Sequence, residues 1–242
     1  MVPWVITRER DDAKLVVDGL RARGLDALCI PGIARTPLPW PASLDLPTGL
    51  FFLTSPFAAR LTMARIGTRA RDYRFAATAP ATFEVVHRAG VEPTVHAPGG
   101  SGQLARAVLD ADIRGTPVLY PTSTAGLEQP EQARAVQTLA SVGVVCRAAV
   151  YETAASPDLD FELRGLRGAP YCAAFFSPSA VEAYAGAVSR GAPPPIFSVC
   201  IGESTLRAYD DARIAAAPTA TLIPRHVDVV EFIADVPQRF AS

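Results

Sequence analysis

The sequence has little charge and few residues that bind metals or form disulfides. Charged residues make up 19% of the 242 residues, the net charge is −1, and only three histidines and four cysteines occur. A charge this close to zero excludes the overall positive field that attracts nucleic acids and anionic membranes. The cysteines form no CxxC pair, and each lies in a short apolar run typical of a strand: Cys29, Cys146, Cys172 and Cys200. We expect buried, reduced thiols rather than disulfides or metal ligands.

The common catalytic signatures are also missing. The chain has neither GxGxxG nor GxxxxGK[ST], so it lacks the phosphate loops of nucleotide-binding proteins. It has no GxSxG elbow, and His87, His96 and His226 stand apart, without the spacing of a metal site or a catalytic triad. We therefore expect no cofactor and no metal, and a chemistry that works without a strong nucleophile.

Long hydrophobic runs are absent, although apolar residues make up 49% of the chain and can form a substantial core. Nowhere do about 18 consecutive apolar residues occur, the length that a membrane span requires. The N-terminal stretch MVPWVITR becomes charged before the apolar core of an export signal is complete. These features predict a cytoplasmic protein with no membrane partner.

Short apolar runs alternate with helical patterns along the chain, which predicts an α/β fold with parallel sheets. In the first unit, residues 5–6 read as a strand, and Asp11 or Asp12 is expected to cap the helix that follows. That helix buries one face, formed by Ala13, Val16, Val17 and Leu20. Gly24 is expected to end it, and residues 27–30 form the second strand.

Two later parts of the chain resemble each other. Residues 50–58 and 172–180 each read as a buried strand, then a serine able to cap a helix, then proline at the first helical position. Residues 75–82 align in the same way with residues 198–205. The capping serines, Ser55 and Ser177, stand 27 and 28 positions before the matching threonines, Thr82 and Thr205. The chain is predicted to contain an internal duplication.

The order of these units predicts two similar lobes, the first of them discontinuous in sequence. The strand–helix–strand unit of residues 116–146 echoes the opening unit but follows its neighbours instead of preceding them. We expect residues 1–35 and 154–242 to form one lobe and residues 38–147 the other, each a flavodoxin-like three-layer sandwich with a parallel sheet. The linkers, about 31–37 and 147–153, are expected to pair as a two-stranded connection; the first runs into proline-rich sequence.

Ligands of parallel sheets bind at the carboxyl ends of the strands, where helix N-termini favour anions. The predicted strand ends and helix starts carry hydroxyls and one arginine: Thr7, Arg8, Ser55, Thr82, Ser101, Ser177, Ser179 and Thr205. Each alone fits an ordinary helix cap. Their recurrence in two lobes favours a shared site for a polar, anionic ligand in the cleft between the lobes.

Five short motifs in this order and spacing resemble the uroporphyrinogen-III synthase family over nearly the whole chain. They are Val5–Arg8, Phe52–Pro56, Ala148–Thr153, Phe175–Val181 and Ile201–Thr205. The resemblance implies a lyase that cyclises linear hydroxymethylbilane to uroporphyrinogen III, inverting the terminal pyrrole ring and releasing water. It implies a polycarboxylate substrate, handed over from hydroxymethylbilane synthase, and no cofactor. Nothing in the sequence indicates an obligate interface, so we expect a monomer.

The same resemblance suggests roles for individual residues. Tyr151 matches the family's linker tyrosine, which hydrogen-bonds or protonates the departing hydroxyl; the alternative is a tyrosine that only packs. Gly202 and Thr205 follow the family's Ile-Gly pattern, and Ser177 and Thr82 its strand-end hydroxyls. These are expected to bind substrate.

The chain departs from the family pattern at Phe57, where asparagine is common, at Ala79, where glycine is usual, and in residues 122–126, where arginine and glycine are common. Fewer donors for carboxylates leave a second hypothesis open, a diverged, non-catalytic protein that binds tetrapyrroles or other anions. A third, an unrelated sugar- or phosphate-binding protein, is disfavoured by the missing phosphate loop and export signal.

Overall fold

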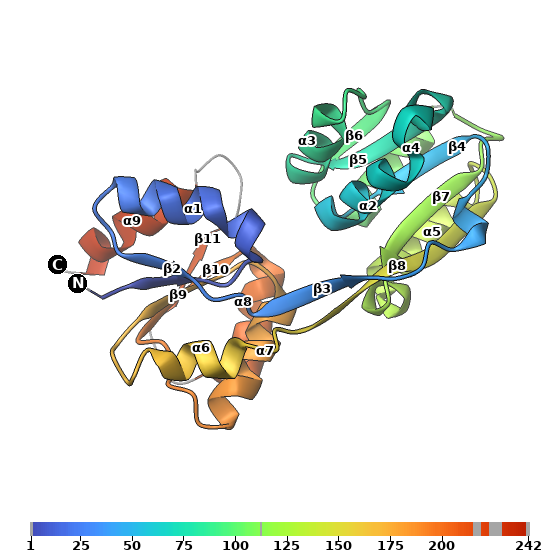
Figure 1. Cartoon of the computed structure of the whole chain (residues 1–242). Helices are drawn as coiled ribbons and strands as arrows, with labels where there is room; N and C mark the ends of the chain where they lie inside the picture. Colours follow the sequence, from blue (N-terminus) through green and yellow to red (C-terminus); the bar gives the residue numbers. More distant parts are fainter. Residues whose placement is uncertain (1, 112, 215–218, 223–228, 241–242) are drawn as a thin grey trace. The chain divides into compact units, whose positions relative to one another are not determined.

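A computed structural model describes residues 2–111, 113–214, 219–222 and 229–240. The chain divides into two compact units (Figure 1): Met1–Ala34 with Ala154–Ser242, called unit 1, and Arg35–Thr153, called unit 2. The chain passes from unit 1 to unit 2 within β3 (Ile33–Pro37) and returns within β8 (Val145–Ala155).

Unit 1 is built on a five-stranded sheet in the order β11-β10-β9-β1-β2. Its strands are β1 (Trp4–Ile6), β2 (Ala27–Cys29), β9 (Cys172–Phe175), β10 (Phe197–Ile201) and β11 (Thr219–Leu222), and neighbouring strands run parallel. In register, Trp4 lies opposite both Ala27 and Cys172, so the N-terminal strand lies inside the sheet and not at its edge.

Helices cover both faces of this sheet (Figure 1). Ile6, on one face of β1, shares a buried cluster with helices α1 (Arg10–Ala22) and α9 (Val229–Phe240). Val5, on the other face, shares a cluster with α6 (Leu159–Gly165) and α7 (Pro178–Ser189), and the same cluster includes Tyr209 of α8 (Glu203–Ala212). Alternate residues of one strand therefore belong to two separate cores.

Unit 2 has a six-stranded sheet in the order β3-β8-β7-β4-β5-β6. Its remaining strands are β4 (Gly49–Leu53), β5 (Tyr73–Ala79), β6 (Val95–Pro98) and β7 (Val118–Ser123), and the five strands from β8 to β6 run parallel. The Leu38 N–H donates to the Val150 carbonyl at 2.9 Å where the chain leaves β3 beside β8.

Two cores again flank the sheet of unit 2. One contains Phe52 of β4 with α4 (Ser101–Asp110) and α5 (Pro130–Leu139). The other contains Phe51 with α2 (Pro56–Ile66) and α3 (Ala81–Arg88). Short 3-10 helices complete the unit: η1 (Ala42–Leu44), η2 (Gly67–Asp72) and η3 (Ala125–Glu128).

The predicted start of α1 is wrong, whereas its end is confirmed. The helix begins at Arg10, after Glu9, so Asp11 and Asp12 lie inside its first turn and neither is the cap. There their charges still face the positive end of the helix. Gly24 follows the last turn with a φ of 78°, a left-handed conformation that glycine adopts without strain.

The two predicted serine caps are confirmed. Ser55 Oγ accepts the Ala58 N–H at 3.4 Å at the start of α2, and Ser177 Oγ accepts the Ala180 N–H at 3.3 Å at the start of α7. Proline occupies the first turn of both helices, as expected. The same local signal thus forms the same strand–helix junction once in each unit.

All four cysteines lie in strands, as predicted, and are free thiols. Cys200 is buried, but Cys29, Cys146 and Cys172 are only partly buried. The expectation of buried thiols is therefore confirmed for Cys200 and wrong for the other three.

Candidate functional site

Two residues singled out by the sequence meet at the carboxyl end of β4. Tyr151 of β8 is 7% exposed, and its hydroxyl donates to Ser55 Oγ at 3.1 Å. Ser55 Oγ also accepts the Ala58 N–H, so both contacts use its lone pairs. The hydroxyl proton of Ser55 is then available to donate to an acceptor such as a carboxylate. The ring of Phe57 lies edge-on to the Tyr151 ring, with their centroids 5.0 Å apart.

A second hydroxyl pair lies at the end of the neighbouring strand, β5. Thr78 Oγ1 donates to Thr82 Oγ1 at 2.9 Å, and both side chains are buried. Thr82 lies in the first turn of α3. Because its hydroxyl oxygen accepts the bond from Thr78, its own proton is available to donate to another acceptor. Thr82 repeats, one strand further along, the donor arrangement of Ser55.

Ser101, in contrast, belongs to a cluster that contains a carboxylate. Its hydroxyl donates to Glu131 Oε1 at 3.5 Å, and it lies near the Tyr120 hydroxyl, which contacts Thr54 Oγ1 at 3.4 Å. Burial raises the pKa of Tyr120, so this phenol stays protonated at neutral pH. The negative charge of Glu131 makes the surroundings of Ser101 unfavourable for an anion.

A guanidinium that the sequence did not single out lies beside this cluster. Arg147 of β8 lies over the Tyr120 ring, with Cζ 5.6 Å from the centroid, and its Nη2 donates to the Gly126 carbonyl. Residues 122–126, which depart from the family pattern, are thus bonded to an arginine from β8. Thr122 Oγ1 donates to Gln132 Oε1 at 2.8 Å and fixes the other side of the same turn.

In unit 1 the predicted threonines face the protein backbone. Thr7 Oγ1 donates to the Ala174 carbonyl at 2.9 Å, and Thr205 Oγ1 donates to the Ile201 carbonyl at 3.0 Å. Each is about 1% exposed. Since a hydroxyl has a single proton, these two residues use their donor to hold strand ends in place rather than to offer it to a ligand.

Other predicted residues of unit 1 surround those strand ends. The Arg8 guanidinium lies over the Phe176 ring, with Cζ 5.1 Å from the centroid. Ser177 caps α7, and Ser179 is exposed in its first turn. Gly202 has a φ of 91° and directs the chain from β10 into α8, a conformation that favours glycine.

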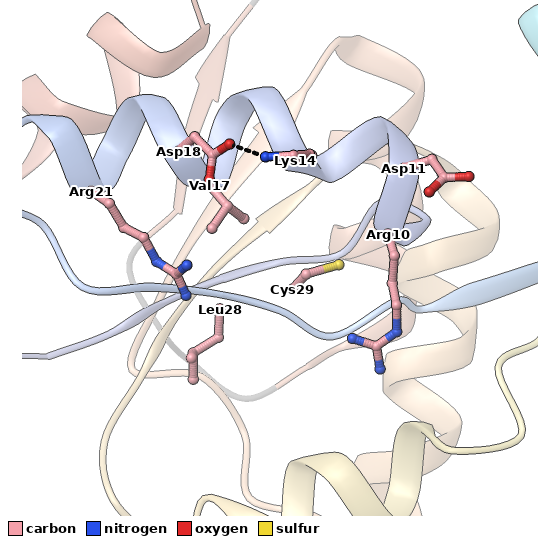
Figure 2. A pocket seen from close by; sticks show the side chains of 8 residues that line it. All are labelled: Arg10, Asp11, Lys14, Val17, Asp18, Arg21, Leu28 and Cys29. Atoms are coloured by element: carbon pink, nitrogen blue, oxygen red, sulfur yellow. Dashed lines mark hydrogen bonds and ion pairs between the residues drawn. The ribbon is translucent and has the colours of Figure 1, made fainter.

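A pocket of about 410 Å³ lies elsewhere in unit 1, between α1 and β2 (Figure 2). It is lined by Arg10, Asp11, Lys14, Val17, Asp18, Arg21, Leu28 and Cys29. Its cations already have partners: Lys14 pairs with Asp18, Arg21 donates to the Ala27 carbonyl at 2.8 Å, and Arg10 pairs with Glu162. Burial raises the pKa of the Cys29 thiol, which keeps it protonated. None of the predicted site residues lines this pocket, and we assign it no role.

Over the described part of the chain, no cluster of three or more histidine, cysteine or acidic side chains could hold a metal ion. His226 lies outside the described residues. Among the residues that the structure describes, no helix has the length and hydropathy needed to cross a bilayer.

A family model described as uroporphyrinogen-III synthase HemD matches residues 14–222, most of the chain. The chain belongs to the uroporphyrinogen-III synthase family. Members of this family are cyclising lyases of tetrapyrrole biosynthesis. No curated protein sequence matches the chain.

The fold also matches that of a solved uroporphyrinogen-III synthase structure. A crystal structure of a mutant uroporphyrinogen III synthase from the extremely thermophilic bacterium Thermus thermophilus aligns with a TM-score of 0.56 and 16% identity, covering 100% of this chain and 98% of that one. The wild-type enzyme from the same organism, in another crystal form, aligns at 0.45 and 16%, covering 100% of both chains. The first likeness shows that this chain has the mixed α/β fold of uroporphyrinogen-III synthase, with parallel sheets.

Within this uroporphyrinogen-III synthase fold, sequence reasoning missed three arginines of unit 2 that contact aromatic rings. They occur in none of the motifs: Arg35 and Arg147 lie within strands, and Arg60 lies within α2. The signal that could have indicated two of them is the aromatic residue in place of the usual asparagine at position 57, because partly exposed aromatic rings attract guanidinium groups.

Proposed function

We propose that this chain cyclises hydroxymethylbilane to uroporphyrinogen III with inversion of the terminal pyrrole ring and loss of water. The family model supports the reaction. The proposed location of the active site rests on the hydrogen bond from Tyr151 to Ser55 at the end of β4. In the reaction the C–O bond of the hydroxymethyl group breaks, and its methylene carbon bonds to the substituted α-carbon of the terminal ring. For inversion, the existing C–C bond at that carbon breaks and a new C–C bond forms at the other α-carbon of the ring, which loses its proton. The departing hydroxyl needs a proton to leave as water. Tyr151 supplies or stabilises that proton.

Strand order supports placing substrate at these strand ends. Counted along the chain, unit 1 has the order 2-1-3-4-5, which is that of flavodoxin-like sheets, and its ligand position lies between the first and third strands, β1 and β9. Unit 2 has the same order if β7 and β8 are counted first, and the equivalent position lies between β7 and β4. Arg8 and Ser177 follow the first pair, and Ser55 follows the second.

The substrate carboxylates then bind hydroxyls, amides and helix N-termini. We assign them to Ser55 and Thr82 in unit 2, and to Arg8, Ser177, Ser179 and the backbone after Gly202 in unit 1. Thr7 and Thr205 support these strand ends through their bonds to backbone carbonyls. We assign no carboxylate to Ser101, because Glu131 lies beside it.

The remaining expectations belong to the same proposal. The enzyme works in the cytoplasm as a monomer, without a cofactor, and receives its linear substrate from hydroxymethylbilane synthase. The reaction needs no redox step, and the reactive group, an azafulvene, arises from the substrate itself. The protein's contribution is to hold the terminal ring in the geometry for inverted closure.

A coupled assay tests the proposal. Porphobilinogen and hydroxymethylbilane synthase generate the substrate, the protein is added, and the oxidised products are separated as isomers I and III. We expect mainly isomer III, whereas spontaneous closure gives isomer I. Isomer I alone, from folded protein at adequate concentration, would overturn the proposal and favour the non-catalytic binding protein.

A further inference from the structure

The ring of Phe57 in unit 2 contacts two arginines beside the proposed site. The Cζ atoms of Arg35 and Arg60 lie 5.7 and 5.6 Å from the centroid of the Phe57 ring, and Tyr151 meets the same ring edge-on. Arg60 comes from the same helix as Phe57, and Arg35 comes from β3, which lies beside the strand of Tyr151. Two elements, α2 and β3, therefore place two cations around one ring, and β8 adds the Tyr151 ring.

A cation–π contact leaves an arginine able to bind an anion. An aromatic face attracts a guanidinium through its quadrupole, which orients the cation but leaves its full charge in place. Arginine stays protonated at every accessible pH and presents parallel N–H groups that fit a carboxylate. Each guanidinium has five N–H donors, so one that already makes a hydrogen bond within the protein keeps donors for a ligand.

We infer that Arg35 and Arg60, held by Phe57, bind a carboxylate of the substrate next to Tyr151 and Ser55. This inference rests on the proposed function and extends it to three residues outside the family motifs. Phe57 stands where the family commonly has asparagine; here the ring provides no donor itself but positions two. The two arginines select a carboxylate-bearing pyrrole ring and hold it against the Tyr151 hydroxyl.

The experiment compares Arg35→Gln, Arg60→Gln and the double variant with the wild type in the coupled assay, at varied substrate concentration. Loss of one charged hydrogen bond is expected to raise KM about tenfold, and the double variant should raise it more, while kcat changes less than about threefold. Arg60→Lys keeps the charge and should restore part of the affinity. Phe57→Leu removes the ring and should raise KM to an intermediate degree.

The matched control is Arg65→Gln. Arg65 lies on the same helix as Arg60, but its Nη2 pairs with Asp45 at 2.9 Å. The same chemical change there should leave KM and kcat unchanged. Far-UV circular dichroism and the urea unfolding midpoint of every variant show whether it is folded, so that a loss of affinity is not a loss of structure.

A second readout separates this inference from the proposed function. Binding of uroporphyrin III is followed by the quenching of protein fluorescence, which requires no turnover. An active wild type whose KM and porphyrin affinity are unchanged in both glutamine variants overturns the arginine site and leaves the cyclase intact. A wild type that gives no isomer III overturns the cyclase, and weaker porphyrin binding by the variants would still support the arginine site.

Discussion

The hydroxyl of Tyr151 reaches a partner 96 positions away in the sequence, Ser55 Oγ. The direction of this bond decides what each group can do. Tyr151 is the donor and Ser55 the acceptor, so a ligand oxygen that accepts from Ser55 ends a chain of two successive hydrogen bonds that starts at both the Tyr151 hydroxyl and the Ala58 N–H. A departing hydroxyl placed at the tyrosine instead competes with Ser55 for the same proton.

Removing that hydroxyl is the sharpest test at the scale of a residue. We expect Tyr151→Phe to lower kcat at least about tenfold, within the contribution of general acid catalysis, with a smaller change in KM. The matched control is Tyr73→Phe. It also removes a partly buried hydrogen bond, from the Tyr73 hydroxyl to the Leu46 carbonyl at 2.6 Å, but Tyr73 begins β5 and so lies away from the carboxyl ends of the strands. Both variants should lose about 1 kcal/mol of stability. Equal kcat values in the two variants would assign Tyr151 a packing role only.

The thiols make stability depend on pH in a predictable direction. Burial raises the pKa of Cys172 to about 11 and that of Cys200 to about 12, from the ordinary value of 9.0. Above pH 9 the unfolded chain loses these protons first while the folded chain keeps them, so the free energy of unfolding falls as pH rises from 9 toward 11 or 12. The urea unfolding midpoint, measured with a reductant from about pH 8 to about pH 10.5, should decrease.

The double variant Cys172→Ala/Cys200→Ala checks the cause of that slope. Without the two thiols, the midpoint should decrease less steeply over the same pH range. A midpoint that rises with pH, or an identical slope in the double variant, would show that these thiols do not govern alkaline stability.

At the scale of elements, the glycine of unit 2 whose Cβ position lies nearest to a backbone atom is Gly143, just before β8. A Cβ at this position would lie 2.3 Å from the Thr116 carbonyl oxygen, a backbone atom that cannot rotate away. Gly143→Ala is therefore expected to cost about 1–3 kcal/mol. At Gly102, in the first turn of α4, an added Cβ would have no atom of the described residues within 4 Å apart from its chain neighbours and the nearby backbone of its own helix. Gly102→Ala should therefore gain about 0.4–1 kcal/mol.

Urea unfolding of the two glycine variants, followed by far-UV circular dichroism, measures both changes. They should have opposite signs relative to the wild type. Destabilisation of equal size in both would show that the loss reflects glycine replacement in general rather than the contact with Thr116.

Elements defined by local signals were predictable, and those defined by distant contacts were not. The Ser-Pro junctions at Ser55 and Ser177 were correct, because capping depends on residues within one turn. The cap of α1 was misplaced, since several acidic residues follow one another and the end of β1 decides which of them enters the helix. The contacts of Arg35 with Phe57 depend on β3 lying beside β8, and no local pattern encodes that pairing.

In the candidate site, too, features set by local sequence were predictable and features set by distant contacts were not. The strand-end hydroxyls were located from sequence, but their donor directions were not: Thr7 and Thr205 face carbonyls of their own unit, whereas Ser55 and Thr82 accept bonds and keep a proton to donate. A hydroxyl's direction depends on which neighbour reaches its lone pairs, and some of those neighbours come from other strands.

At the scale of the whole molecule, each unit has its own pair of cores, but only unit 2 is continuous in sequence. Unit 1 depends on β1, which lies between β9 and β2 and places the fully buried Val5 and Ile6 into opposite cores. Losing residues 1–34 therefore removes two neighbouring strands and α1 from unit 1, whereas residues 35–153 keep both cores of unit 2.

This difference predicts how fragments fold. A fragment of residues 35–153 should unfold cooperatively in urea, and a fragment of residues 154–242 alone should not, because β9 lacks its partner β1 and both cores lose the side chains that β1 contributes. Adding a peptide of residues 1–34 to the second fragment should restore helical circular dichroism and a cooperative transition, while the same peptide leaves the 35–153 fragment unchanged. Cooperative unfolding of 154–242 without the peptide would mean that β1 is dispensable, and an unstructured 35–153 fragment would mean that unit 2 needs unit 1 in order to fold.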